Sequence, residues 1–298
     1  MLAVTVDIED WYHVPAVTGS PFSKYKDVDE FFAKWKGRYD YLTGPTQRVL
    51  DILDEFKIRA TFFVVADVTE HYPGLVQQIA QRGHEIACHG LHHACKLNPE
   101  TKKPLMSQSE FEQRTLQAKK LLEEASDQQV IGYRAPAAYV GGWILDTLEK
   151  LGFKYESSVS GNSFYNKSDS RLKGVGTKPY YPRKGGLEPG EKRGILEMPL
   201  PYYTVGLKFP TAGGPMLRFL GARYIMLGLK QSLKRGDTVF YFHPIDISRE
   251  KFPSGFSVKR PFYWAIKGKA VERKVRYCLS HFSSGIIVQA KDIYDQYK

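Results

Sequence analysis

The fold class follows from Leu2-Ala3-Val4-Thr5-Val6-Asp7-Ile8-Glu9-Asp10, a run of nine residues at the start of the chain. Its first part is apolar and β-branched, which is typical of a strand buried in a parallel sheet. Its last part brings a cluster of acids to the end of that strand. We therefore expect a site at the end of the first strand.

Three further short motifs carry reactive side chains. They are His89-Gly90-Leu91-His92-His93, Gly132-Tyr133-Arg134-Ala135-Pro136 and Phe240-Tyr241-Phe242-His243-Pro244. Each of these motifs ends or follows a short run that predicts a strand. Together with the first motif they supply carboxylates, histidines with metal-ligand spacing, an arginine and a lone histidine. The set predicts one hydrolytic site, although each fragment alone is a weak signal.

Apolar runs alternate with helical periodicity along the chain, which favours a βα series around a parallel sheet or barrel. The predicted strands are 2–8, 60–66, 85–88, 130–133, 154–157, 195–198, 238–242 and 286–290. The predicted helices are 46–56, 73–81, 108–125, 142–151, 215–232, 269–282 and 291–297. In such barrels the site lies at the carboxyl ends of the strands, where Asp7, Arg134 and His243 are expected.

Length and composition indicate one folded domain. The 298 residues are 42% hydrophobic and contain neither an internal repeat nor a low-complexity linker. We expect a single domain over 1–298, in which 249–298 is a C-terminal extension packed on the barrel. The sequence contains no run of 18 or more apolar residues, so we expect no transmembrane helix.

The N-terminus enters a strand without a basic start or a cleavage site, so we expect no signal peptide and a cytoplasmic protein. Three cysteines without disulfide-like spacing also fit a reducing compartment.

The chain is basic, with 43 Lys and Arg against 32 Asp and Glu and a formal net charge of +11. This charge fits an anionic partner such as an acidic glycan or a membrane surface, and it equally fits a solvated basic surface. No nucleic-acid motif accompanies it, so no nucleic-acid partner is expected.

Two long segments interrupt the βα rhythm. Segment 12–44 is aromatic and polar, and segment 158–194 is rich in Gly, Lys, Tyr and Pro. Loops of this length are usually functional or mobile. We expect both to form rims of a substrate groove, because aromatic faces suit sugar rings. Packing of Trp11 and Phe31 at the barrel mouth is an equal alternative.

The histidine motif has the spacing of a metal site. His89 and His93 can present two imidazoles to one ion, and a carboxylate from the first strand would complete three protein ligands. Spacing alone also allows His92 in place of His93. A structural zinc with Cys88 and Cys95 does not match the short cysteine spacing of such sites. Surface histidines without a metal are the remaining alternative.

The order and content of these motifs resemble the polysaccharide deacetylases, the metal-dependent sugar N-deacetylases of carbohydrate esterase family 4. The likeness extends to Glu197-Met198-Pro199-Leu200 and Gly213-Gly214, and it is closest to the branch whose first motif reads Asp-x-Glu-Asp. It implies a distorted (β/α)7–8 barrel and a divalent metal ion, with Zn²⁺ as the expected cofactor.

The resemblance also implies roles for the acids and histidines. Asp7 would be the general base, and His89 and His93 would be metal ligands. Strand alternation places Glu9 on the face of Asp7 and favours it as the third ligand. The shorter Asp10 resembles the family's usual aspartate more closely, so Asp10 is slightly preferred and Glu9 is kept beside it.

By the same resemblance, Arg134 would pair with the base, Pro136 would shape the following turn, and the backbone N–H of Ala137 would stabilise an oxyanion. A plain structural salt bridge is the alternative for Arg134.

His243 would protonate the leaving amine, with Asp246 or Glu156 to orient it. The alternative for His243 is a core histidine bonded to a backbone carbonyl.

These expectations lead to a metal-dependent hydrolase that removes N-acetyl groups from N-acetylhexosamine units of a polysaccharide, glycolipid or glycan precursor. A second hypothesis is a metal-independent hydrolase of small cyclic amides or ureides, similar to the allantoinases of the same superfamily. A third is a catalytically silent glycan-binding protein. Retention of His89, His93 and the acid cluster speaks against loss of the metal.

Overall fold

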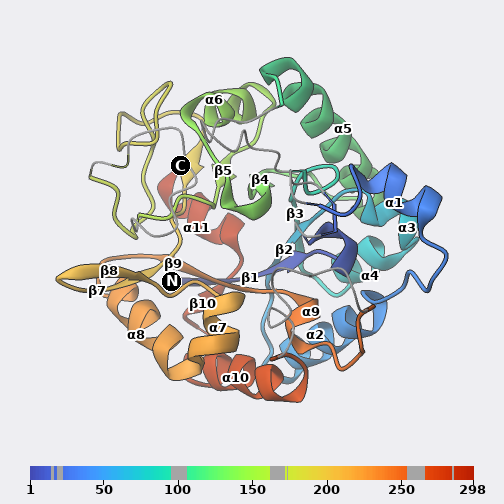
Figure 1. Ribbon diagram of the computed structural model, residues 1–298. Coiled ribbons are helices and arrows are strands. Elements are labelled where there is room, and N and C mark those ends of the chain that lie inside the picture. The colour runs from blue at the N-terminus through green and yellow to red at the C-terminus, as the bar shows by residue number, and fades with distance from the viewer. Residues whose placement is uncertain are drawn as a thin grey trace.

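The structure is a computed structural model that describes residues 1–14, 17–18, 23–94, 106–161, 172, 174–253, 266–283 and 285–298. Its centre is an eight-stranded parallel sheet that curls into a half-barrel, with helices around the outside (Figure 1). The strand order is β10-β1-β2-β3-β4-β5-β6, and β9 pairs with β1 off this path. The predicted distorted barrel is thereby confirmed.

The strands of this sheet agree in place with the predicted runs, although most are shorter. They are β1 Leu2–Ile8, β2 Thr61–Val64, β3 Glu85–Cys88, β4 Gly132–Tyr133, β5 Tyr155–Glu156, β6 Leu196–Glu197, β9 Thr238–Phe242 and β10 Ile287–Val288.

The first strand lies in the middle of the sheet and organises it. Every residue of β1 is buried. Ile8 lies opposite Val64 of β2, and Val6 lies opposite Phe242 of β9. Because β1 is covered on both faces, its sequence is almost continuously apolar up to the acids at its end. This position also brings the carboxyl ends of β1, β2 and β9 together.

The helices enclose the sheet and end at recognisable signals. They are α1 Val28–Lys34, α2 Thr43–Glu55, α3 Val68–His71, α4 Leu75–Gln81, α5 Gln108–Ser126, α6 Gly142–Lys150, α7 Pro215–Leu220, α8 Ala222–Leu233, α9 Pro244–Ile247, α10 Lys269–Ser280 and α11 Ala290–Tyr297. The longest, α5, begins where the Ser107 hydroxyl accepts the Glu110 N–H at 3.2 Å, an ordinary N-cap. Gly83 and Gly152 adopt the left-handed conformation just after α4 and α6, as the sequence predicts.

Several elements differ from the sequence-based expectation. The single helix predicted over 215–232 is two helices, because Gly221 between α7 and α8 has a φ of 85°. An unpredicted hairpin, β7 Tyr202–Val205 and β8 Leu207–Pro210, turns at Gly206, whose φ is 71°. The short helices α1, α3 and α9 were also not predicted, since each is too brief to show a helical period.

The aromatic residues after β1 pack against one another. Trp11 lies in a short 3₁₀ turn, η1 Trp11–His13, and its ring meets Phe31 edge to face at 5.2 Å between centroids. Trp11 is 3% exposed and Phe31 is fully buried. For these two residues the packing alternative therefore holds, and they do not form a groove rim. Within segment 158–194, residues 162–171 and 173 lie outside the described residues.

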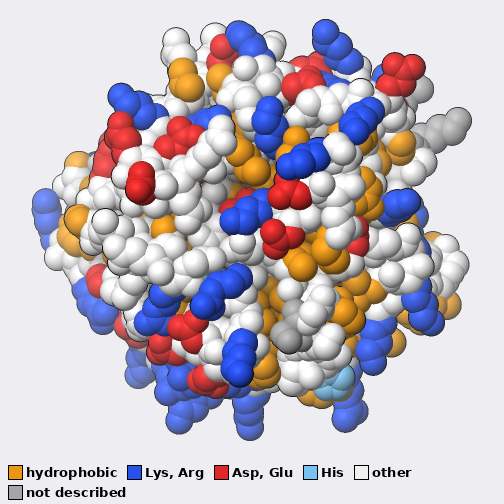
Figure 2. Space-filling model, turned by 180° about the vertical axis from the view of Figure 1, so that it is seen from behind, with side chains coloured by type: hydrophobic (Ala, Val, Ile, Leu, Met, Phe, Trp, Pro, Cys, Tyr) orange, Lys and Arg blue, Asp and Glu red, His pale blue; other side chains and the backbone are white. Residues whose placement is uncertain are grey.

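The C-terminal segment joins the same sheet. Strand β10 pairs with the start of β1, and α10 packs on α8 and α9. Among the described helices, none is both long and apolar enough to cross a membrane. On the face drawn in Figure 2, the Lys and Arg side chains are spread among acidic and hydrophobic ones.

Candidate active site

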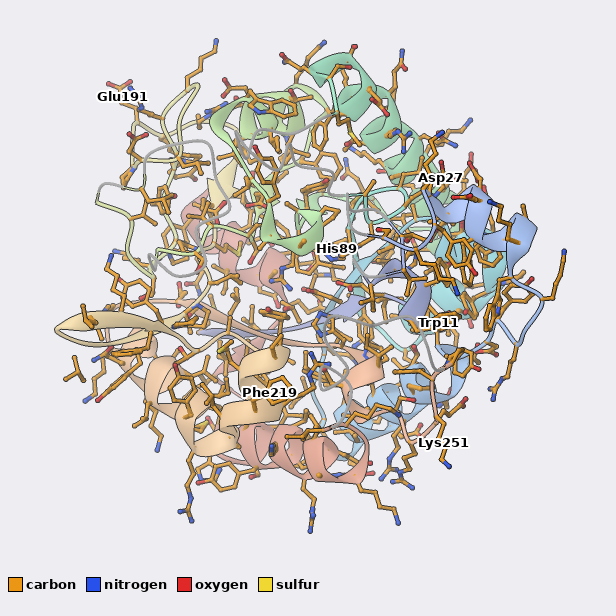
Figure 3. The ribbon with its side chains drawn as sticks, viewed as in Figure 1. Trp11, Asp27, His89, Glu191, Phe219 and Lys251 are labelled. Carbon is orange, nitrogen blue, oxygen red and sulfur yellow. The ribbon has the colours of Figure 1, made fainter. Side chains whose placement is uncertain are left out.

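Four strand ends bring the predicted reactive side chains together. Asp7 and Glu9 come from the end of β1, His89 follows β3, Arg134 follows β4 and His243 follows β9. His89 lies near the middle of the ribbon, among these strand ends (Figure 3). Asp7, Glu9 and His243 present ligand-type atoms within 4.8 Å of one another, as do Glu9, His89 and His93.

Arg134 fixes Asp7. Its Nη1 donates to Asp7 Oδ1 at 2.6 Å and to the Thr5 hydroxyl at 2.8 Å. Its Nε and Nη2 donate to the carbonyl and the hydroxyl of Ser157 at 2.8 and 3.0 Å. The pair is buried, and Phe63 lies under the guanidinium at 4.1 Å from its ring centroid. This network leaves Asp7 Oδ2 facing the site, 3.9 Å from His243 Nε2.

Glu9 meets both candidate metal ligands. Its Oε1 lies 3.0 Å from His89 Nε2 and 3.1 Å from His93 Nε2. The other ring nitrogens are held by the backbone: His89 Nδ1 donates to the Arg134 carbonyl at 2.7 Å, and His93 Nδ1 donates to the His13 carbonyl at 3.1 Å. A neutral imidazole that donates from Nδ1 has a lone pair on Nε2. In their neutral forms, His89 and His93 would therefore each direct a lone pair at the same oxygen of Glu9.

The charges around Glu9 favour its ionised form. Burial would raise the pKa of this carboxyl, but the neighbouring His93, His243 and His89 outweigh burial and lower the pKa well below its usual value. Burial in turn lowers the pKa of His93 despite the nearby carboxylate. The cluster therefore places an ionised Glu9 carboxylate beside a His93 imidazole whose protonated form is disfavoured by burial.

The preference for Asp10 as the third ligand does not fit this geometry. The Asp10 carboxylate turns away from the histidines, where it accepts the Trp11 N–H at 2.7 Å and the Tyr72 hydroxyl. Burial raises the pKa of Asp10 to about 7. Asp10 caps η1, the turn whose His13 carbonyl accepts a hydrogen bond from His93, so Asp10 supports the position of His93. Glu9, which strand alternation favours, lies where the third ligand is expected, beside His89 and His93.

Of the two acids proposed to orient His243, Asp246 is the one that contacts it. Its Nδ1 donates to Asp246 Oδ2 at 2.9 Å, and its backbone N–H donates to the same oxygen at 2.9 Å. Asp246 is itself paired with the buried Arg218 at 3.1 Å. Burial alone would lower the pKa of His243, but the charges of Asp246, Glu9 and Asp7 raise it to about 9. The other candidate partner, Glu156, hydrogen-bonds elsewhere.

The turn after Arg134 has an unusual backbone. Ala137 and Ala138 have φ values of 54° and 56°, a left-handed conformation that costs non-glycine residues roughly 1–2 kcal/mol each. Pro136 begins the turn, and a Cβ on Gly90 would lie 3.0 Å from its Cγ, so the turn packs closely on the histidine loop. The predicted oxyanion donor, the Ala137 N–H, lies in this strained turn.

His92 takes no part in the Glu9 cluster. Its Nδ1 lies 3.3 Å from Asp67 Oδ2, and Asp67 also contacts His13 Nε2 at 2.9 Å. Cys88 is buried in β3, and burial raises the pKa of its thiol to about 12. Cys95 lies outside the described residues. Among the residues that the structure describes, the groups with metal-site geometry contain no cysteine.

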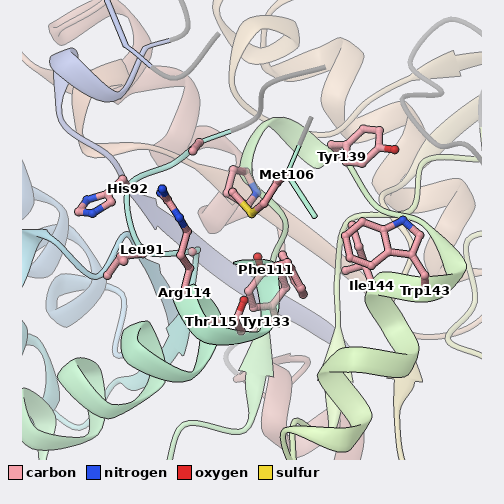
Figure 4. A pocket seen from close by; sticks show the side chains of 13 residues that line it. Leu91, His92, Met106, Phe111, Arg114, Thr115, Tyr133, Tyr139, Trp143 and Ile144 are labelled. Carbon is pink, nitrogen blue, oxygen red and sulfur yellow. The ribbon is translucent and has the colours of Figure 1, made fainter. Parts of the chain in front are cut away.

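A pocket adjoins the site on the side of α5 and α6 (Figure 4). Gly90 and Pro136 form the border that it shares with the catalytic loops. Its wall is largely aromatic and apolar, with Phe111, Trp143 and Tyr139, and Arg114 projects into it. No sequence signal indicated this pocket, because the residues that α5 and α6 contribute have ordinary amphipathic spacing and the rest come from separate loops and β4.

Other contributors were also missed or left open. Thr5 and Ser157 hold Arg134, but neither residue type gives a sequence signal of that role. Asp246 had a usable signal: its spacing of three from His243 is that of a capping box, which the structure contains.

Comparison with known proteins supports the sequence-based resemblance. Residues 39–156 match the polysaccharide deacetylase family, and residues 170–291 match a domain of unknown function, DUF3473. Both matched regions contribute strands to the one sheet.

The chain is similar to the peptidoglycan-N-acetylglucosamine deacetylase of Bacillus cereus, with 29% identity over 37% of this chain and 47% of the relative. It is also similar to the chitooligosaccharide deacetylase of Sinorhizobium fredii, with 40% identity over 18% of this chain and 28% of that relative. In both cases the match spans less than half the length of the relative. The similarity to polysaccharide deacetylases thus lies within residues 39–156, which make up less than half of the chain.

Solved structures agree on the fold. A crystal structure described as a polysaccharide deacetylase from Mycobacterium smegmatis superposes with a TM-score of 0.62 and 20% identity, over 99% of this chain and 88% of that one. The Puue allantoinase superposes with a TM-score of 0.56 and 15% identity, over 99% and 89%. The deacetylases and this allantoinase therefore share the fold, which alone does not distinguish the two chemistries.

Proposed function

We propose that this protein is a metal-dependent hydrolase that removes N-acetyl groups from N-acetylhexosamine units of a polysaccharide, glycolipid or glycan precursor. The observation that carries the proposal is the meeting of Glu9, His89 and His93, in which two imidazole nitrogens lie 3.0 and 3.1 Å from one carboxylate oxygen. Asp7, Arg134 and His243 surround the same point.

The donor set fits a divalent cation. With both imidazoles neutral, two Nε2 lone pairs would face the Glu9 carboxylate, and a carboxylate is costly to bury without a positive charge beside it. His93 Nε2 is buried, and its 3.1 Å contact with Glu9 Oε1 does not have hydrogen-bond geometry. Two imidazoles and a carboxylate are the ligand set of many catalytic zinc sites, and their outer nitrogens are typically bonded to carbonyl groups, as here.

The protein's own groups supply the remaining chemistry. A divalent ion bound there would activate water and polarise the acetamide carbonyl. Asp7 is the proposed general base, because Arg134 fixes its orientation with Oδ2 toward the site. The Ala137 N–H is the proposed oxyanion donor.

His243 is the proposed general acid. With its pKa raised to about 9 it carries two protons near neutral pH. Asp246 accepts the proton on Nδ1, so the proton on Nε2 faces the acidic cluster, where a leaving amine would form. This is the arrangement that proton donation to an amine requires.

The substrate class comes from the relatives and agrees with the surroundings of the site. The relatives are named for N-acetylated glycans, peptidoglycan and chitooligosaccharides. The pocket bordered by Gly90 and Pro136 offers the rings of Phe111 and Trp143 to an adjoining sugar. The net charge of +11 favours an anionic glycan or a glycan carried on an anionic membrane.

The test compares acetate release from an N-acetylglucosamine oligomer with hydrolysis of a cyclic ureide, before and after chelation and with zinc added back. We expect acetate release that chelation abolishes and zinc restores. Ureide hydrolysis that survives chelation would favour the allantoinase-like alternative. Glycan binding without turnover of either substrate would favour a silent binding protein.

A further inference from the structure

Two buried carboxyl groups outside the catalytic cluster face one another at the ends of β5 and β6. Glu156 and Glu197 are directly opposite in the parallel register, and both are fully buried. Because neighbouring strands of a sheet lie about 5 Å apart, this register brings the two carboxyl groups side by side. Glu156 Oε2 also accepts the Ser158 N–H at 2.9 Å, and Glu197 Oε1 accepts the Val159 N–H at 3.0 Å. No donor of the described residues reaches Glu197 Oε2.

Two carboxylates in such contact cannot both be ionised, so the pair must keep one proton between them. Burial raises the pKa of both groups, and the charge of Glu156 raises that of Glu197 further. The charged and titratable groups that face the pair are Arg134, whose charge works against this rise at Glu156, and Tyr180, a neutral phenol. Arg134 directs its own hydrogen bonds to Asp7, Thr5 and Ser157 instead.

The pair is connected to the catalytic turn through Ser158. The Ala135 N–H donates to the Ser158 hydroxyl at 2.7 Å, and that hydroxyl donates to Glu156 Oε1. A longer contact of 3.3 Å joins Ala135 N directly to Glu156 Oε1. Ala135 lies between Arg134, which holds the candidate base, and the left-handed turn of Ala137 and Ala138.

We propose that Glu156 and Glu197 form a proton-sharing positioning pair that, through Ser158, holds the Ala135–Ala138 turn in its strained conformation for catalysis. The pair acts through the turn because neither carboxyl group is exposed to substrate. The inference rests on the proposed deacetylation for its kinetic consequences, whereas the shared proton and the held turn can be observed without turnover.

The first readout is spectroscopic. Infrared difference spectra of wild type against Glu197→Gln, near neutral pH, should show a protonated-carboxyl band in wild type that the variant lacks. Glu85→Gln is the matched control, since Glu85 is a buried carboxyl bonded to Thr61 and Tyr155, away from the turn. Absence of the Glu197-dependent band would overturn the shared proton.

The second readout separates kcat from KM. Glu197→Gln should keep kcat within about threefold, because an amide N–H can replace the shared proton. Ser158→Ala and Glu197→Ala should lower kcat by about 10²-fold, the scale of a misplaced catalytic group, with metal content and KM nearly unchanged. Wild-type kcat in both would overturn the positioning role. Should Glu197→Ala fail to fold, Ser158→Ala and Glu197→Gln still decide the matter.

A third readout does not need a substrate. Hydrogen exchange of the Ala135 amide should be faster in Ser158→Ala than in wild type and unchanged in Glu85→Gln. If this change and the infrared band are found in a protein that releases no acetate, the positioning pair stands and the proposed function fails. If acetate is released but the exchange rate is unchanged, the pair fails and the function stands.

Discussion

At the residue scale, the site depends on which way each acid of the first motif points. Alternation along β1 puts Asp7 and Glu9 on one side, and Asp10 turns outward to cap η1 and meet Tyr72. The sequence predicted the group of acids but not this division of roles. The structural role of Asp10 could not be predicted, because its partner Tyr72 is 62 residues away and no local sequence pattern indicates that contact.

Asp7→Asn tests the proposed base. The amide cannot accept the proton, so turnover should fall by at least ~10²-fold. Metal content should not change, because Asp7 pairs with Arg134 and is not one of the proposed metal ligands. Elemental analysis beside acetate release measures both. The exposed Asp295→Asn in α11 is the control, and loss of metal in Asp7→Asn would make Asp7 a ligand.

His243→Ala tests the proposed acid. We expect ~10²–10⁴-fold slower turnover with metal retained.

Asp246→Asn should act in a milder way: without the carboxylate that raises the pKa of His243 to about 9, the imidazole loses its proton at lower pH. The alkaline limb of the kcat profile should then move to lower pH, and an unmoved limb would contradict the assigned partnership.

At the element scale, strand positions were predictable and strand lengths were not. Runs such as 238–242 are apolar because the strand is covered on both faces, so burial could be predicted from the sequence. The β7–β8 hairpin lacks the usual turn pair and rests on Gly206 alone. The Glu156–Glu197 contact depends on the register of β5 and β6, which a single sequence does not reveal.

Gly213→Ala tests a close approach between elements. A Cβ at Gly213 would lie 1.3 Å from the carbonyl oxygen of Tyr241 in β9, so the strand that carries His243 must shift. We expect a loss of roughly 1–3 kcal/mol in the free energy of unfolding, together with slower turnover. Denaturant unfolding measures the first effect. Gly285→Ala meets nothing within 4 Å and should change stability by less than about 0.5 kcal/mol.

At the scale of the whole molecule, the half-barrel was predictable because alternating runs and motif order agree on it. The sheet also ties the ends of the chain together, since β10 pairs with the start of β1. Branch membership by the Asp-x-Glu-Asp motif and the domain limits stay predictions.

The pH dependence of global stability should follow the buried His84. Burial lowers its pKa to about 4, and its Nδ1 accepts the Ala60 N–H at 3.1 Å. The unfolded chain, with an imidazole pKa near 6.5, binds more protons between these values. The free energy of unfolding should therefore fall as pH drops from about 6.5 to 4, by up to ~3 kcal/mol. His84→Gln should flatten the dependence of the unfolding free energy on pH, whereas His281→Gln, at an exposed position, should not. Equal pH dependence in wild type and His84→Gln would contradict the assignment to His84.

Metal content tests the central claim most directly. Purified wild-type protein, equilibrated with zinc and dialysed, should hold about one ion per chain, the stoichiometry of a three-ligand site. His89→Ala and Glu9→Ala should lose it, whereas Asp10→Asn should retain it. A wild type that binds no ion, or an ion that survives both His89→Ala and Glu9→Ala, would contradict the proposed site.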